Sequence, residues 1–178
     1  MINQKYRRIM KQIIYSIVFC SLATFVSGQV AIGKENIDGN SALLDFASGT
    51  TKGIILPAVD AAPVTLSVQN NGTLLFDKTD KKVKMWENGS YVELSDEGDS
   101  SEIVTNTSSE IGEGVIIGTE TSNAVGVLIL ESTDKALILP RVINPHLNIK
   151  SPYPGTICYD IASKTLAVFD GSAWHFWK

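Results

Sequence analysis

Short apolar runs of strand length alternate with polar turns along most of this chain. Three such blocks follow one another in the first half: Lys52–Pro57, Gly72–Asp77 and Val83–Tyr91. The same order returns 83 residues later in three further blocks: Lys135–Pro140, Gly155–Asp160 and Leu166–Trp174. A fixed offset between strand-like blocks predicts two tandem copies of one β module.

Identical residues in the two copies fall where backbone geometry is decided. Over the gap-free stretch from Lys52/Lys135 to Leu94/Trp177, nine positions are identical: Lys52, Ile55, Leu56, Pro57, Val59, Gly72, Thr73, Asp77 and Lys81. A glycine and a proline each fix backbone dihedrals that other residues rarely adopt. The repeat is therefore one of architecture.

The last third of each copy predicts a three-stranded meander. The expected strands are 73–77, 83–87 and 91–94, then 156–160, 166–170 and 174–177. Asn88-Gly89 and Asp170-Gly171 are expected to supply the positive φ angles of tight hairpin turns. The predicted turn and hairpin residues are Pro57, Gly72, Asn88, Gly89, Pro140, Gly155, Asp170 and Gly171.

Earlier β-branched runs predict two more strands in each copy. Residues 29–33 and 115–118 open the copies, and apolar runs at 41–46 and 126–131 follow. The offset is 85 at the first pair and 83 from Lys52 onward, which places a two-residue length change around Glu35–Asn40. Both segments after the prolines, 58–71 and 141–154, are expected to be long ordered connections, with one helical turn in the first and little helix in the second.

The first 28 residues have the pattern of a secretory signal peptide. Four basic residues precede an apolar run from Ile13 to Val26, and Val26-Ser27-Gly28 offers small residues for cleavage. An uncleaved anchor and a lipoprotein attached at Cys20 are the alternatives. The predicted organisation is a signal peptide (1–28), a first module (29–94), an acidic Ser/Thr/Gly-rich linker (95–114) and a second module (115–178). The predicted fold class is all-β.

Charge and cysteine content exclude several function classes. Without residues 1–28 the chain has 11 basic residues against 19 acidic ones, a formal charge of −8, which disfavours a nucleic-acid partner. Cys158 is then the single thiol, so no intramolecular disulfide can form, and a buried, inert thiol is expected.

No group of residues in the sequence predicts catalysis, a metal or a cofactor. His146 and His175 lack partners at metal-ligand spacing. Asp77 and Asp160 each follow a strand, where a carboxylate caps backbone N–H groups. Asp96, Glu97 and Asp99 lack calcium-loop spacing and are interpreted as linker residues. We therefore expect a non-enzymatic protein.

Aromatic side chains are the remaining candidates for recognition. Most of them flank hairpin turns as pairs, Trp86 with Tyr91 and Phe169 with Trp174, which is typical of cross-strand packing. Phe176 and Trp177 have no aromatic counterpart in the first copy. Trp174, Phe176 and Trp177 are therefore the candidate interaction residues, and a carbohydrate-binding module that uses them is the alternative function.

The order of motifs resembles a repeat of exported Bacteroidetes proteins and phage tail-fibre-like proteins. The matching residues are Val30–Gly33, Ala42–Asp45, Lys52–Pro57, Gly72–Phe76 and Trp86–Gly89, and in the second copy Leu139–Arg141, Gly155–Tyr159 and Phe169–Gly171 with Trp174. The resemblance implies a β-rich, surface-exposed fibre or adhesin-type segment that often assembles as a trimer. The length of the chain favours a small subunit over a long multidomain fibre.

Together these observations predict an exported structural or interaction protein at the cell surface. The expected location is the outer-membrane surface, the extracellular space or the periplasm. The expected partners are a protein or glycan at the cell surface and further copies of the same chain, with a trimer suspected.

Overall fold

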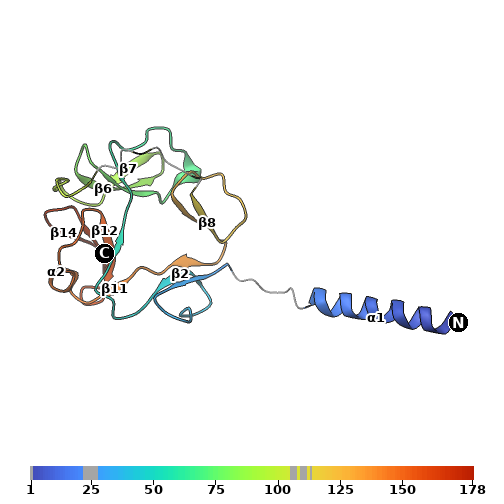
Figure 1. Cartoon of the computed structure of the whole chain (residues 1–178). Helices are drawn as coiled ribbons and strands as arrows, with labels where there is room; N and C mark the ends of the chain where they lie inside the picture. Colours follow the sequence, from blue (N-terminus) through green and yellow to red (C-terminus); the bar gives the residue numbers. More distant parts are fainter. Residues whose placement is uncertain (1, 22–27, 105–107, 109–111, 113) are drawn as a thin grey trace.

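The computed structural model describes residues 2–21, 28–104, 108, 112 and 114–178, and it is an all-β fold with few helices (Figure 1). A long helix, α1 (Ile2–Ser21), lies apart from the strands. The first half contains β1 (Val30–Ile32), β2 (Ala42–Phe46), β3 (Ile54–Ile55), β4 (Ala58–Val59), the 3-10 helix η1 (Val68–Asn70), β5 (Leu74–Asp77), β6 (Lys82–Glu87) and β7 (Ser90–Glu93). The second half contains β8 (Val115–Ile117), β9 (Leu128–Leu130), β10 (Ala136–Leu137), β11 (Arg141–Val142), α2 (Pro145–Asn148), β12 (Thr156–Asp160), β13 (Thr165–Phe169) and β14 (Trp174–Trp177).

The predicted signal peptide coincides with α1. Within the described part of the chain, α1 included, no helix combines the length and hydropathy needed to cross a bilayer. The predicted cleavage site includes Val26 and Ser27, which lie outside the described residues. Export therefore stays a prediction from the sequence.

The two predicted meanders are present, and they share one register. In the first, Leu74 is opposite Met85 and Trp86 is opposite Tyr91. In the second, the residues 83 positions later, Ile157 with Val168 and Phe169 with Trp174, are paired in the same way. Each first meander strand also has a short parallel neighbour, β4 beside β5 and β11 beside β12.

The N-terminal strand pairs are also alike, and they correct the predicted position of the length change. β1 runs parallel to β2 with Val30 opposite Leu44, and β8 runs parallel to β9 with Val115 opposite Leu128. The spacing within a pair is thus longer by one residue in the first half. Only one of the two extra residues lies between the paired strands, and the other lies between the second strand and Lys52 or Lys135, because the parallel ladders fix the register on both sides of that turn.

Two strand pairings connect the two halves of the chain. β10 from the second half pairs with β2, and β3 from the first half pairs antiparallel with β12. Leu56 N–H donates to the carbonyl oxygen of Gly155 at 3.0 Å and extends the second pairing. The two predicted modules therefore exchange strands.

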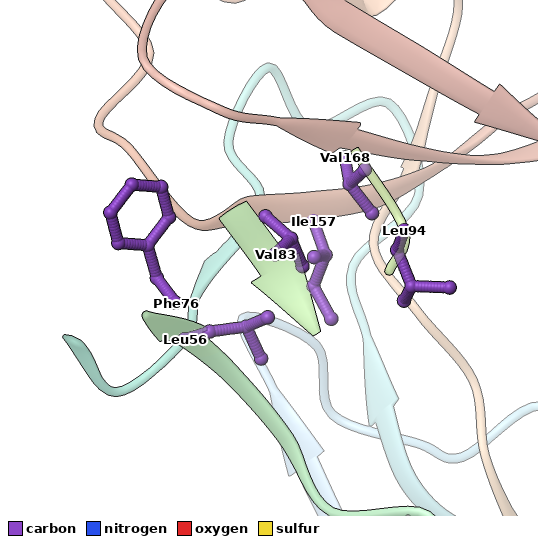
Figure 2. Packing of buried hydrophobic residues seen from close by; sticks show 6 residues of the cluster. All are labelled: Leu56, Phe76, Val83, Leu94, Ile157 and Val168. Atoms are coloured by element: carbon purple, nitrogen blue, oxygen red, sulfur yellow. The ribbon is translucent and has the colours of Figure 1, made fainter. Parts of the chain in front are cut away.

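The main hydrophobic core lies between the two meanders (Figure 2). Val83 and Ile157 lie side by side at its centre, with Phe76 and Val168 on either side of them. The remaining fully buried members are Leu56 and Leu94. Because four of these six residues come from the first half and two from the second, neither meander has a complete core alone.

A smaller core surrounds Cys158 on the outer side of the second meander. Val142, Ile149 and Ala167 pack around its thiol, and Trp174 closes the cluster. Burial, and then the nearby Asp160 carboxylate, raise the pKa of the Cys158 thiol to about 12. The expectation of a buried, inert cysteine is confirmed.

The two hairpin turns differ in type, which corrects part of the turn prediction. Asn88 and Gly89 both have positive φ (51° and 86°), as a type I′ turn requires. In the second meander Asp170 is the residue before the loop, its N–H donates to the carbonyl oxygen of Ala173, and only Gly171 has positive φ (99°). Glycine at the first loop position is typical of a type II′ turn. The Asp170 carboxylate instead accepts the N–H groups of Ser172 and Ala173 at 2.7 Å, which holds it outside the loop.

The described part of the predicted linker lies against the strands. Ser95 is buried and its Oγ accepts the N–H of Val83 at 3.0 Å. Asp99 N–H donates to the carbonyl oxygen of Asp170, and Ile103 packs against the main core. Most of residues 105–113 lie outside the described residues. The segment after the first meander thus contributes to folding, and the strand considered at 103–104 is not formed.

Three buried aspartates anchor the corners of the fold. Asp77 accepts backbone N–H groups of Ala62 and Thr79, and Asp160 accepts those of Asn144 and Ala162, all at 3.0 to 3.2 Å. Asp45 contacts Lys34 Nζ at 2.5 Å. Burial by itself would raise the pKa of each carboxyl, but these hydrogen bonds outweigh it and hold all three pKa values below the ordinary range. The predicted turn-capping role of Asp77 and Asp160 is confirmed.

These carboxylates predict a loss of stability in acid. A folded pKa below the unfolded value of about 3.9 contributes stability that is fully present above pH 5 and is lost as the pH falls through the folded pKa. We expect the urea midpoint, followed by tryptophan fluorescence, to be level between pH 7 and about pH 5 and to fall steeply below about pH 4. A midpoint that stays level down to pH 2.5 would contradict this role.

Candidate interaction surface

The candidate aromatic residues of the last strand point to opposite faces of the sheet. Trp174 packs on the core around Cys158 and contacts the ring of Phe169, with ring centroids 5.4 Å apart. Phe176, two residues later and therefore on the same face, is 42% exposed and stands edge-on to His146. Trp177 is on the other face, where its Nε1–H donates to the carbonyl oxygen of Leu94 at 2.5 Å. The three side chains therefore do not form one stacking platform.

The predicted cross-strand aromatic pair of the first meander is formed as well. Trp86 and Tyr91 meet edge-on with ring centroids 5.0 Å apart. The Nε1–H of Trp86 donates to Ser67 and the hydroxyl of Tyr91 donates to Pro63, in each case to the backbone carbonyl oxygen. These polar ends tie the connection 58–71 to the meander, so both rings serve packing.

An apolar cavity of about 620 Å³ opens beside the first meander. The segment 122–131, with β9, forms one wall, and the start of β5 with residues 54–57 forms another. Several apolar side chains at this place are exposed, notably Val125 at 81% and Val127 at 61%. Sequence analysis did not single out this region, because its residues are ordinary strand residues and only their grouping makes the surface apolar.

The start of β5 forms one edge of this cavity, and it is an open strand edge. On one side β5 pairs with β6, and on the other β4 covers only Phe76 and Asp77. Over the described chain, Gly72, Thr73 and Leu74 have no strand on that second side. Gly72 is exposed, and a Cβ added to it would meet no atom of the described residues within 4 Å.

The corresponding edge in the second meander is covered. Gly155, Thr156 and Ile157, 83 residues later, are all buried, because β3 pairs with β12 at this place. A Cβ added to Gly155 would lie 3.7 Å from Cβ of Leu56. The chain therefore contains two equivalent edges, one filled and one open. An open edge with an apolar surround is a place where a further strand can bind by backbone hydrogen bonds.

Comparison with protein families gives one match, and it covers the second half. Residues 116–178, from within β8 to the end of β14, match the family described as "phage tail like trimerisation region". Searches of curated proteins and of solved structures return no match. The C-terminal part of the chain is thus phage tail-fibre-like, being similar to a phage tail-like trimerisation region.

Proposed function

We propose that this chain is a structural subunit of an exported, fibre-like or adhesin-like assembly and that it works as a homotrimer. One observation carries the proposal: the region similar to a trimerisation region contains exposed apolar residues around the cavity. Val115, Val125, Val127 and Leu128 are 49 to 81% exposed in the single chain. Apolar side chains gathered at one place favour a protein–protein contact.

The size and composition of the fold support the same proposal. Several strands have only two or three residues, and three separate small sheets accompany one of five strands. Small sheets bury little apolar area per residue, and association with further copies adds to it. The signal-peptide pattern of residues 1–28 and the acidic remainder of the chain agree with export and with a partner other than nucleic acid.

Chemical cross-linking in the producing cells tests this function. A lysine-reactive reagent is expected to give a ladder of the chain that ends at three, and cell fractionation is expected to recover the protein outside the cytoplasm. A ladder restricted to the single chain would contradict the trimer, and recovery in the cytoplasm would contradict export. The two readouts therefore test the two parts of the proposal separately.

Carbohydrate binding by the last strand is the second candidate. Phe176 and Trp177 are exposed by 42% and 43%, and this partial exposure favours it. Trp177→Ala and Phe176→Ala should then each abolish retention on a glycan array, whereas Tyr91→Ala, at the other hairpin, should leave it unchanged. Equal retention of all four proteins would remove this candidate.

A further inference from the structure

We infer that the open edge at Gly72–Leu74 is the binding site for the segment Leu137–Leu139 of a second copy of this chain, and that this contact, repeated head to tail, closes the trimer. The inference rests on the proposed trimer and specifies its contact. It follows from a pairing that the chain already makes within itself. The segment 54–56 of the first half pairs with the edge 155–157 of the second half. Displaced by 83 residues, the same two elements are Leu137–Leu139 and Gly72–Leu74.

The backbone groups that this pairing needs point the right way on the strand side. In the observed pair, Ile54 is opposite Ile157 and Leu56 N–H bonds to Gly155, so the groups of residues 54 and 56 face the partner strand. Their equivalents are Leu137 and Leu139. The N–H groups of Ala136 and Ile138 bond instead to the β2 side, to Ser41 and Leu44. Because backbone groups alternate along a strand, those of residues 137 and 139 face away from β2.

The same is true at the receiving edge. Trp86 N–H donates to the carbonyl oxygen of Thr73, and Phe76 N–H donates to that of Pro57. The alternation therefore turns the N–H and carbonyl groups of Leu74 toward the uncovered side. Thr73 and Leu74 are half-buried, whereas Thr156 and Ile157 at the covered edge are 3% and 2% exposed. Both halves of the contact are thus present in each chain and unoccupied in the part that the structure describes.

One substitution between the copies limits the extent of the contact. A Cβ on Gly53 would lie 2.5 Å from Cγ2 of Thr156, so glycine is needed for the close approach there. Its equivalent is Ala136, whose methyl group prevents the same approach to Thr73. The intermolecular pairing therefore begins at Leu137. Leu137 and Leu139 are half-buried, in keeping with a strand that has one covered and one open side.

A contact of this kind is heterologous, because the giving segment and the receiving edge are different surfaces. Each chain both gives a strand and receives one, so the contacts continue until a ring closes or a filament grows. Closure at three matches the trimer proposed for this chain. The apolar cavity beside the edge receives the leucine side chains of the incoming segment, since Leu74 and Leu130 are among its lining residues.

Two matched glycine substitutions test the receiving edge. Gly72 and Gly89 have nearly the same φ (88° and 86°), and a Cβ at either meets nothing within 4 Å of the described residues. Gly72→Asn and Gly89→Asn thus place the same side chain under the same backbone strain. In the full chain, Gly72→Asn is expected to weaken trimer formation at least tenfold, measured by light scattering on dilution, and Gly89→Asn is expected to behave as wild type.

Disulfide trapping tests the giving segment, in a Cys20→Ser background. Ile55 and Thr156 are directly opposite each other, and their equivalents are Ile138 and Thr73. A tagged Thr73→Cys chain produced together with an untagged Ile138→Cys chain is expected to yield a disulfide-linked pair with one tag. Neither variant alone should give it, and Ile55→Cys/Thr156→Cys in one chain is the internal positive control.

The outcomes separate this inference from the proposed function. A wild-type trimer without the mixed disulfide, or a trimer that tolerates Gly72→Asn, overturns the edge contact and leaves the trimer intact. A wild-type monomer overturns the trimer and the contact with it. A disulfide formed within one chain by Thr73→Cys/Ile138→Cys and absent from the mixed pair also overturns the contact.

Discussion

Replacing Phe76 with alanine is expected to lower the free energy of unfolding by about 3 to 5 kcal/mol. Phe76 is completely buried, and it packs in the core that residues of both meanders form together. Removing the ring leaves a cavity between the two halves, so both halves lose contacts at once. We expect one cooperative transition in urea, followed by circular dichroism, and its midpoint should fall as a whole.

Tyr159→Ala is the matched control for that substitution. Tyr159 takes the place of Phe76 in the second meander, with the same register, but it is only half-buried. We expect its cost to be less than half that of Phe76→Ala, because less apolar area leaves contact. Two separate transitions, with only one shifted by Phe76→Ala, would show that the halves fold independently and would contradict the shared core.

Replacing Asp77 with asparagine is expected to cost about 3 kcal/mol, the second largest effect. Asp77 and Lys84 form an ion pair at 2.8 Å, with side-chain exposures of only 4% and 9%. Lys84 Nζ has one further carboxylate contact, to Asp80, which is 47% exposed. Asparagine would leave a buried ammonium group poorly compensated and would place an amide N–H₂ where N–H donors already point.

The second meander provides the comparison for this prediction. Its equivalent of Asp77 is Asp160, and its equivalent of Lys84 is Ala167, so the carboxylate there is held by N–H groups and by the hydroxyl of Ser163 at 2.6 Å. Asp160→Asn should therefore cost less than Asp77→Asn, in urea titrations of both. Adding Lys84→Ala to Asp77→Asn should recover part of the loss. A double variant that is less stable by the full sum of the single changes would contradict the pairing.

Much of the fold could be predicted because the repeat determines local geometry. The meander strands, the Asn88-Gly89 turn and the corner aspartates follow from residues that occupy equivalent places in both copies. Lys81 and Lys164, an identical pair, even share a positive φ of 55° and 58°. Local patterns of this kind depend on neighbours in sequence, and sequence reveals them directly.

The remaining features depend on which edges meet in space. The pairing of β3 with β12 and of β10 with β2 could not be predicted, because a strand pattern does not specify its partner. The packing of Ser95 and Ile103 escaped prediction for a related reason, since a polar, acidic composition hid two residues with buried contacts. The open edge at Gly72 follows from the same pairings: the glycines at 72 and 155 are identical in sequence, and only the structure shows that one is covered.

The mass of the chain in solution tests the central claim most directly. Light scattering over a concentration series would be carried out on the full chain and on residues 29–178, so that association through the N-terminal helix is distinguished from association through the strands. The proposed homotrimer predicts three times the mass of one chain for both proteins, stable on dilution into the micromolar range. The mass of a single chain at every concentration would contradict it.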